Sequence, residues 1–288
     1  MFKGSYVALV TPFKDGKVDE KKFRELIEFH IDKGTDGIVP CGCTGEAATM
    51  NMTEQKRLMK VAVEMSDKRI PVMAGTGSNN TAEAVELTVS AKKAGCDAAL
   101  IITPYYNKPT PEGQYRHYEK IAKEADIPIM LYNVPSRTGI SLSPATIARL
   151  NKIDNIVAIK EAGGSVQQVT EILSLCDIIV MSGDDSMTLP FMSVGAKGVV
   201  SVVANIIPEK IRKLTQSYLD GEEEISRSVH YEIVDLCRAM FIETNPIPVK
   251  TAMDMMGMLE AEWRLPLCEM TPENSEQLRE VLKRYKLV

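Results

Sequence analysis

The chain has 288 residues, of which 44% are hydrophobic and 25% are charged, and its net charge is -5. Because the basic residues are scattered among acidic ones, the sequence has no electrostatic footprint for binding nucleic acid. It also contains no apolar run of about 18 residues, so no membrane span is expected. A small molecule is the expected partner.

The N-terminal segment, MFKGSYVALVTPFKDG, lacks the continuous apolar stretch and the cleavage pattern of an export signal. We therefore interpret it as part of the fold and predict that it contains the first strand. Six cysteines are spread irregularly along the chain, which predicts reduced thiols and a cytoplasmic location. Cys41 and Cys43 form a C-x-C motif without a second pair or a nearby histidine cluster. We therefore expect no metal site.

Short apolar runs bounded by turn residues recur along the first 202 residues and alternate with helix-like stretches. They cover residues 6–10, 37–40, 71–74, 98–103, 128–132, 156–159, 178–181 and 198–202. Most are continuously apolar, as parallel strands buried on both faces require. This alternation is typical of repeated βαβ units.

The stretches between these runs carry helix signals. Residues 19–33 place apolar side chains on one face behind Asp19, which is a candidate N-cap. A capping side chain followed by proline, the arrangement favoured at a helix start, occurs at Thr110, Ser143 and Thr271. Residues 222–288 show helical patterns and no further strand.

Eight strands that alternate with helices fit either a closed (β/α)8 barrel or an open doubly wound sheet. No G-x-G-x-x-G motif follows an early strand to favour the doubly wound sheet. We predict an α/β fold, a (β/α)8 TIM barrel over residues 1–221 that carries catalysis, with a small C-terminal all-helical domain over 222–288.

In such a barrel, the loops that follow the strands converge on one mouth, and catalytic groups are expected there. These strand ends are unusually polar. The second strand runs into residues 41–46, the fourth into 103–107, the fifth into 132–139, the sixth into Lys160 and Glu161, and the seventh into 182–185.

Lys160 follows an apolar strand, so its ammonium is expected at the mouth of the barrel. It can pair with an acid such as Glu161, or burial can lower its pKa until the neutral amine becomes a nucleophile. Tyr132, at the end of the preceding strand, has a phenol that can donate or accept a proton. The turn of Gly42, Thr44 and Gly45 can bind a carboxylate at a helix N-terminus or can simply be a strand-to-helix turn.

These residues lie in blocks that resemble one known family along essentially the whole chain. The blocks are GSYVALVTPF, GCTGEAATM, VMAGTGSN, ITPYYNKP, LYNVPSRTG, IKEA, SGDD and ETNPIPVK. They resemble the dihydrodipicolinate synthase family of the pyruvate-dependent N-acetylneuraminate lyase and class I aldolase superfamily. LYNVPSRTG followed at this distance by IKEA is highly specific, whereas SGDD alone would be weak.

The resemblance implies a lyase that condenses pyruvate with L-aspartate-4-semialdehyde, a step of diaminopimelate and lysine biosynthesis. It implies that Lys160 forms the Schiff base with pyruvate and that Tyr132 shuttles protons. No dissociable cofactor is then needed, because the iminium is the electron sink. The family is usually a homotetramer, a dimer of dimers, and Tyr106 resembles the tyrosine that enters the active site of a neighbouring subunit.

The resemblance also implies a substrate site. Thr44, with backbone groups of the preceding residue, would hold the pyruvate carboxylate, and the backbone around Gly183 and Val200 would line the same pocket. Arg137 would bind the carboxylate of the semialdehyde, for which a planar guanidinium is suited. An arginine in a surface turn is the structural alternative.

Two positions depart from the family pattern. Cys43 stands where the family usually has a threonine that links its two tyrosines, so the relay of Tyr132, Cys43 and Tyr106 is expected to work with altered efficiency. Relatives that are inhibited by lysine bind it near the positions of Asn79, Glu83 and Tyr105, which are present here. However, Ala47, Met52 and Gln55 replace the serine and histidines of strongly inhibited relatives, which predicts weak or absent inhibition.

Three alternatives remain at this point. Another pyruvate aldolase of the superfamily, such as N-acetylneuraminate lyase or a keto-deoxy-sugar-acid aldolase, shares the lysine and tyrosine but generally lacks the arginine at position 137. A catalytically silent relative could bind pyruvate or amino acids. A phosphate-binding barrel is disfavoured, because Asp184 and Asp185 would repel phosphate.

Overall fold

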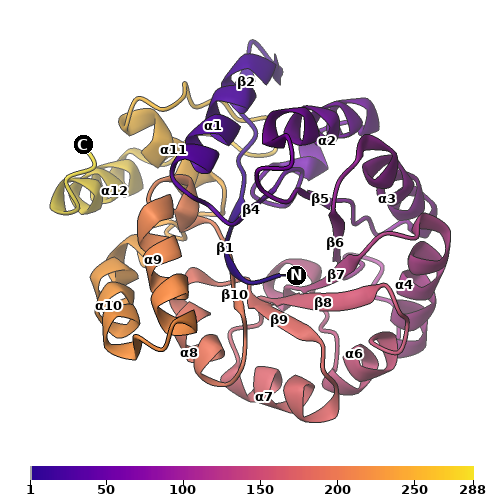
Figure 1. The fold of residues 1–288 in the computed structure, drawn as a ribbon. Coiled ribbons are helices and arrows are strands. Elements are labelled where there is room, and N and C mark those ends of the chain that lie inside the picture. Colours follow the sequence, from indigo (N-terminus) through magenta and orange to yellow (C-terminus); the bar gives the residue numbers. More distant parts are fainter. Residues whose placement is uncertain (1) are drawn as a thin grey trace.

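The computed structural model describes residues 2–288. Eight parallel strands form one sheet in the order β4-β1-β10-β9-β8-β7-β6-β5. A parallel bridge between Ile38 and Val72 joins its two ends, so the sheet closes into a barrel (Figure 1). The predicted (β/α)8 barrel is confirmed.

The eight strands agree with the expected apolar runs to within a few residues. They are β1 (Gly4–Ala8), β4 (Gly37–Val39), β5 (Met73–Gly75), β6 (Ala98–Ile102), β7 (Ile129–Asn133), β8 (Ile156–Glu161), β9 (Ile179–Ser182) and β10 (Gly198–Ser201). The first strand ends two residues before the expected Val10. A small antiparallel hairpin, β2 (Phe13–Lys14) and β3 (Lys17–Val18), then follows, and the apolar pattern did not predict it.

Helices surround the barrel. They are α1 (Glu20–Asp32), α2 (Met52–Ser66), α3 (Thr81–Ala94), α4 (Pro111–Ala125), α5 (Pro135–Thr138), α6 (Pro144–Leu150), α7 (Val166–Leu175), α8 (Thr188–Ser193) and α9 (Pro208–Leu219), with short 3-10 helices η1 (Ala47–Thr49), η2 (Asp185–Met187) and η3 (Val203–Asn205). The predicted caps are confirmed, because the side chains of Asp19, Thr110, Ser143 and Thr271 each accept a backbone N–H at the start of a helix.

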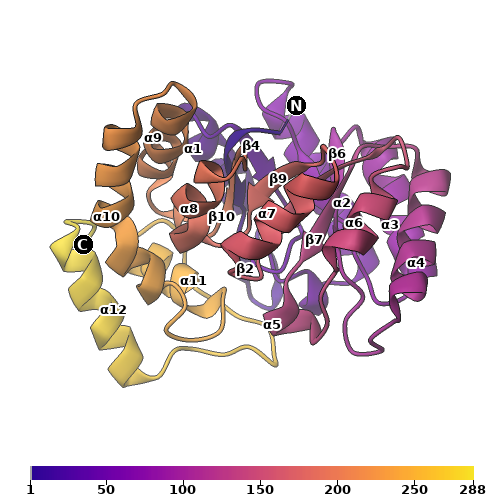
Figure 2. The same ribbon diagram turned by 90° about the horizontal axis from the view of Figure 1, so that it is seen from below.

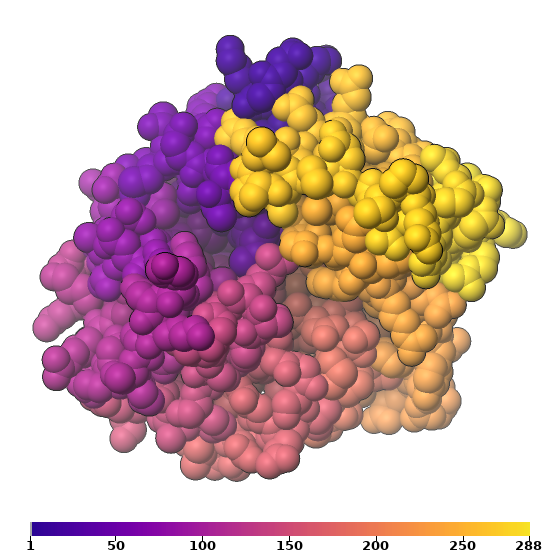
Figure 3. Space-filling view, turned by 180° about the vertical axis from the view of Figure 1, so that it is seen from behind, coloured from indigo at the N-terminus to yellow at the C-terminus, as the bar shows by residue number. Residues whose placement is uncertain are grey.

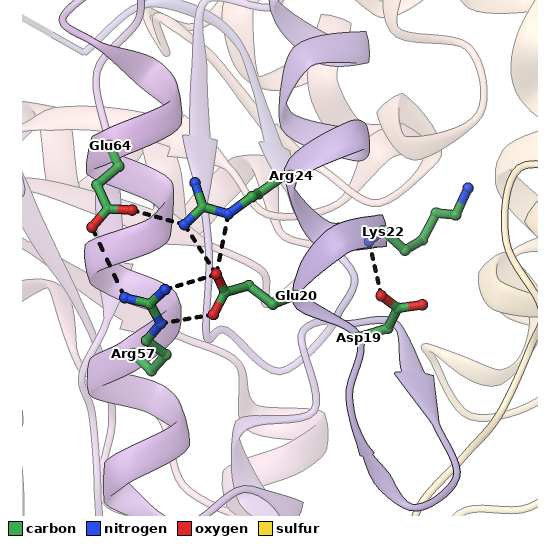
Figure 4. Close-up of polar contacts among 6 residues, drawn as sticks. All are labelled: Asp19, Glu20, Lys22, Arg24, Arg57 and Glu64. Atoms are coloured by element: carbon green, nitrogen blue, oxygen red, sulfur yellow. Dashed lines mark hydrogen bonds and ion pairs between the residues drawn. The ribbon is translucent and has the colours of Figure 1, made fainter.

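Ionic contacts also join neighbouring helices on the outside of the barrel. Glu20 of α1 accepts hydrogen bonds from Arg24 of the same helix and from Arg57 of α2, and Arg24 also contacts Glu64 (Figure 4). These side chains are between about a third and a half exposed. Exposed ion pairs contribute little stability individually, so this network mainly orients α1 and α2.

Three further helices follow the barrel: α10 (Glu223–Ala239), α11 (Ile247–Met255) and α12 (Pro272–Arg284). Figure 2 shows α11 on the same side of the barrel as α5, which follows β7. Figure 3 shows the C-terminal part of the chain beside its N-terminal part, around a hollowed centre. A division into two domains at residue 221 stays a prediction. Of these helices, α11 contacts η3, which follows the carboxyl end of β10.

The apolar core has two layers. The larger layer lies between the sheet and its surrounding helices, and the smaller one fills the barrel interior. Because successive side chains of a strand point to opposite faces, Met130 and Tyr132 of β7 face the interior, whereas Ile129 and Leu131 pack outward. The same alternation on β8 places Lys160 on the inner face with Ala158 and places Glu161 outward.

Candidate active site

A cavity of about 580 Å³ opens at the end of the barrel where the strands terminate. Its lining includes Cys43 from the turn after β4, Tyr132 from β7, Arg137 from α5, and Asn245 from the segment before α11. Segments far apart in the sequence therefore contribute polar groups to one cavity, which is the usual arrangement of a ligand site in a barrel.

Lys160 lies on the inner face of β8, one residue before the carboxyl end of the strand, and is 5% exposed. Its neighbour across the sheet is Tyr132 of β7, and the Lys160 Nζ lies 4.2 Å from the centroid of the Tyr132 ring. Burial lowers the pKa of Lys160 to about 8, while the nearby Cys43 and Asp185 act in the opposite direction and Arg137 lowers it further. About a tenth of a group with this pKa is neutral at pH 7, so a nucleophilic population of the amine is present.

The acid that follows Lys160 in sequence is not its partner. Glu161 is buried on the outer face of the sheet, where it accepts hydrogen bonds from Asn133, Gln168 and the backbone of Gly163. The pairing of Lys160 with Glu161 that the sequence left open is therefore wrong, because neighbouring strand residues point to opposite faces.

Tyr132 is buried, at 6% exposure, inside the barrel. Burial raises its pKa well above the usual range, with further upward contributions from the charge and hydrogen bond of Cys43 and a downward one from Arg137. The phenol is therefore protonated at neutral pH and has a proton that it can donate. Cys43 is partly buried and packs against the apolar interior of the barrel.

Gly183 follows β9 and lies directly against the lysine. A Cβ atom at this position would lie 2.9 Å from Lys160 Cε and 2.7 Å from Ala162 Cβ, which is closer than real Cβ contacts. The absence of a side chain thus makes room for Lys160. Val200, on β10, is fully buried in the barrel interior.

The turn after β4 is compact. The backbone N–H of Glu46 donates to the carbonyl of Cys43 at 3.0 Å, and Thr11 Oγ1 donates to the carbonyl of Gly45 at 2.6 Å. Of the two alternatives for this turn, the structure has no α-helix N-terminus directly after it, because Glu46 adopts φ 54° and only the three-residue η1 follows before α2 begins at Met52. This left-handed residue stops the chain from entering an α-helix directly.

Thr44, in the same turn, is 3% exposed, and its Oγ1 accepts a hydrogen bond of 3.0 Å from Asn245 Nδ2. Two residues further, Glu46 forms an ion pair of 2.6 Å with Lys250 of α11, and both side chains are fully buried. Lys250 Nζ also donates to the carbonyl of Glu262 at 2.5 Å. The C-terminal segment is thus fastened to the turn at two points.

Arg137 is exposed at the rim of the cavity, on the single-turn helix α5 that directly follows β7. Its Nη2 donates to the backbone carbonyl of Asn245 at 2.7 Å. The remaining guanidinium N–H groups can therefore face a ligand carboxylate while this contact holds the side chain.

Two carboxylates, Asp184 and Asp185, follow the carboxyl end of β9. Asp185 is buried, and its Oδ2 accepts the backbone N–H groups of Val202 and Val203 at 3.0 and 3.1 Å. Asp184 accepts from Ser186 at the start of η2. The acids after β9 therefore cap backbone groups, and Asp185 opposes the lowering of the Lys160 pKa.

The remaining predicted residues lie outside this cluster. Tyr106 is 88% exposed, and the structure does not place it with Lys160 in the same chain. Tyr105 and Glu83 line an outer part of the cavity, where Glu83 accepts from Ser78 at 2.8 Å. Asn79 does not line it, and its backbone carbonyl accepts from Asn107.

The sequence reasoning missed three residues of the site: Asp185 as a neighbour of the lysine, and Asn245 and Lys250 as contacts of the turn. The block ETNPIPVK was the available signal, because it contains both Asn245 and Lys250, but its place in space could not be inferred. Among residues 2–288, no group of three or more histidine, cysteine or acidic side chains could hold a metal ion. In the same range, no helix has the length and apolar character needed to cross a membrane.

Comparisons with known proteins give a consistent result. The model of the Dihydrodipicolinate synthetase family matches residues 1–285. A 4-hydroxy-tetrahydrodipicolinate synthase of Syntrophobacter fumaroxidans is 55% identical over the full length of both chains. The crystal structure of dihydrodipicolinate synthase from Aquifex aeolicus is 50% identical, with a TM-score of 0.98 over 99% of each chain. A chloride-inhibited synthase from Acinetobacter baumannii, solved in complex with pyruvate, is 44% identical, with a TM-score of 0.98 over the whole of both chains.

Proposed function

The chain belongs to the dihydrodipicolinate synthetase family, its activity is the synthesis of 4-hydroxy-tetrahydrodipicolinate, and we propose that Lys160 carries this activity as a Schiff-base nucleophile. The family and the enzyme class predicted from the sequence are confirmed. The alternatives of a different pyruvate aldolase, a silent binding protein and a phosphate-binding barrel are rejected on the full-length match to synthases.

The substrates in this proposal are pyruvate and L-aspartate-4-semialdehyde. The neutral Lys160 amine adds to the keto carbon of pyruvate. The keto oxygen takes up two protons, one released by the attacking nitrogen and one from a general acid, and leaves as water. Tyr132, protonated and beside the amine, is the proton donor. The single observation that carries the proposal is a buried lysine with a lowered pKa next to a protonated phenol.

The resulting iminium draws electrons away from the methyl carbon, which loses a proton to give an enamine. The enamine carbon attacks the aldehyde carbon of the semialdehyde, and the aldehyde oxygen takes up a proton. The substrate amine then adds to the imine carbon, closes the ring and releases Lys160. Because the iminium is the electron sink, this course needs no dissociable cofactor.

We assign the two substrate carboxylates to different groups. Thr44 and the backbone of Cys43 would hold the pyruvate carboxylate, with Gly183 and Val200 lining the same pocket. Arg137 would bind the semialdehyde carboxylate, since it lies at the rim and is anchored through only one of its nitrogens. The pyruvate complex of the Acinetobacter baumannii relative supports this choice of first substrate.

We further propose that Tyr132, Cys43 and Tyr106 form a proton relay in which Tyr106 comes from a neighbouring subunit of a homotetramer. The 88% exposure of Tyr106 in the single chain supports this, because such an aromatic side chain is available to a partner. The free thiols, which include Cys43, agree with a reducing compartment, and we propose the cytoplasm. We assign any binding of a lysine effector to Asn79, Glu83 and Tyr105.

Borohydride reduction in the presence of pyruvate tests the proposal directly. The peptide that contains Lys160 should gain the mass of a reduced pyruvate adduct, and Lys160→Ala should abolish both this gain and turnover of aspartate semialdehyde. Lys152→Ala, which changes an exposed lysine before the same strand, is the matched control. A wild-type protein that gains no mass, or a Lys160→Ala variant that condenses its substrates at near-native speed, would disprove the role of Lys160.

The second substrate is tested separately. Arg137→Met should leave pyruvate trapping intact but raise KM for aspartate semialdehyde by at least tenfold, because a charge-assisted contact is lost. Arg116→Met, at a surface arginine, is the control. Turnover of sialic acid in place of the semialdehyde would contradict the assignment.

A further inference from the structure

Asn245 contacts both residues to which we have assigned a substrate carboxylate. Its side-chain Nδ2 donates to Thr44 Oγ1 at 3.0 Å, and its backbone carbonyl accepts from Arg137 Nη2 at 2.7 Å. The two contacts come from positions 201 and 108 residues away in the chain. Asn245 lies in the lining of the cavity and is 5% exposed. Its contact with Thr44 is buried, and its contact with Arg137 is partly buried.

The contact with Thr44 determines what that hydroxyl can still do. A hydroxyl has one hydrogen to donate and two lone pairs that accept. Because the amide of Asn245 occupies a lone pair, the hydrogen of Thr44 remains free to donate. Among the hydrogen bonds of residues 2–288, Thr44 Oγ1 takes part only in this one, as acceptor. A carboxylate placed beside Thr44 would supply the missing acceptor.

The segment that carries Asn245 is held against the turn by a second contact. Lys250, one turn into α11, forms the fully buried ion pair with Glu46, and its Nζ lies 4.6 Å from the centroid of the Phe13 ring. Glu46 belongs to the same turn as Thr44, and Lys250 belongs to the same segment as Asn245. The ion pair between Glu46 and Lys250 therefore helps to hold the Asn245 side chain at its distance from Thr44. Because the Thr44 and Asn245 side chains are already held in place, little side-chain entropy is lost when a ligand binds.

We infer that Asn245 is a positioning residue of the pyruvate site, which turns the Thr44 hydroxyl hydrogen toward the pyruvate carboxylate. This inference rests on the proposed function of Thr44. The side chain of Asn245 acts on the pyruvate subsite, whereas only its backbone carbonyl supports Arg137. A substitution of the side chain therefore affects the two substrates differently, which a loss of general stability would not do.

A double-mutant cycle with Asn245→Ala and Thr44→Val tests this division. Pyruvate binding is measured as the pyruvate concentration that gives half-maximal borohydride trapping, and KM for the semialdehyde is measured in turnover. Asn245→Ala should raise the half-saturating pyruvate concentration about five- to tenfold, the typical effect of losing one neutral hydrogen bond, and should change KM for the semialdehyde less than twofold. In the Thr44→Val background, the same substitution should have almost no further effect, because the residues act as one unit.

Two other variants keep the test decisive. Asn245→Asp preserves size and shape but offers only acceptors, so Thr44 would donate to it and pyruvate binding should fall further than in Asn245→Ala. Asn155→Asp, at an asparagine that donates to the backbone carbonyls of Ala122 and Ile127 away from the cavity, should leave pyruvate binding unchanged even if it lowers Tm.

Additive effects of Asn245→Ala and Thr44→Val would overturn the inference, as would equal increases for both substrates or wild-type pyruvate binding by Asn245→Asp. These results differ from failure of the proposed function itself, in which the wild-type protein would trap no pyruvate.

Discussion

Lys160 and Tyr132 are direct neighbours across β8 and β7, with the lysine Nζ 4.2 Å from the centroid of the phenol ring. Each side chain is buried, and burial shifts both pKa values toward the neutral form: downward for the amine and upward for the phenol. One environment thus favours a neutral amine and a protonated phenol side by side. This pairing predicts how the reaction depends on pH.

Imine formation should become faster as pH rises, with a midpoint near the Lys160 pKa of about 8. Only the neutral amine adds to pyruvate, so the rate increases as the ammonium loses its proton and levels off above that pKa. The measurement is the initial rate of reductive trapping across the pH range, in buffers of equal ionic strength. A midpoint near the usual lysine value of about 10.4 would show that the amine is not perturbed.

Gly183→Ala should reduce imine formation by at least tenfold while the protein remains folded. The added methyl group would lie 2.9 Å from Lys160 Cε, so the lysine must move from its position beside Tyr132. Trapping rate and Tm are measured together. Gly113→Ala, at an α4 position where the new Cβ would meet Pro109 at 3.1 Å, is the control and should keep wild-type kinetics. Equal trapping rates in the two variants would contradict the steric argument.

Cys43→Thr should raise turnover or leave it unchanged. A hydroxyl is a stronger hydrogen-bond partner than a thiol, so a relay through position 43 should transfer protons at least as well. Cys43→Ala, which removes the polar atom, should lower kcat, and the pair of variants separates loss of the relay from a change in packing. A collapse of activity in Cys43→Thr would show that the thiol has a role of its own.

Lys250→Met should lower the free energy of unfolding by about 3 kcal/mol or more, because it leaves the Glu46 carboxylate buried without its counterion. Burial already raises the pKa of Glu46, and Lys250 opposes that shift. Without the lysine, the folded protein holds a proton on Glu46 more tightly than the unfolded chain does. Stability of the variant should therefore fall as pH rises from the usual carboxyl pKa towards the raised pKa of Glu46, and should recover in acid.

Denaturant unfolding at two pH values measures this effect. Adding Glu46→Gln to Lys250→Met should restore most of the loss, since the uncompensated charge is gone. Lys210→Met, at the exposed pair with Glu232, should cost less than about 0.5 kcal/mol. A deficit that does not change with pH would argue against a buried carboxylate as its cause.

Lysine should inhibit this enzyme weakly or not at all. Ala47 and Met52 line the outer cavity with apolar groups, and the amide of Gln55 is committed to the backbone carbonyls of Ala47 and Met50. Few donors thus remain for an amino acid carboxylate. Turnover is measured with increasing lysine, and Met52→His should increase inhibition. Half-inhibition of the wild-type protein by submillimolar lysine would refute the prediction.

The recurrence of apolar runs in the sequence was enough to predict the barrel, because parallel strands buried on both faces require such runs. The loops that follow the strands of a barrel meet at one mouth, and this rule was enough to place Lys160, Tyr132 and Arg137 near one another. Family resemblance supplied their proposed roles. These features depend on positions close along the chain or on the regular geometry of the barrel.

Tertiary structure alone decided the partners of these residues. The side-chain alternation of β8 sends Glu161 away from Lys160, and the return of the C-terminal segment places Asn245 on Thr44 and Lys250 on Glu46. Contacts that span about 200 residues leave no periodic trace in the sequence, because they arise from the way α11 packs over the rim rather than from local backbone preference.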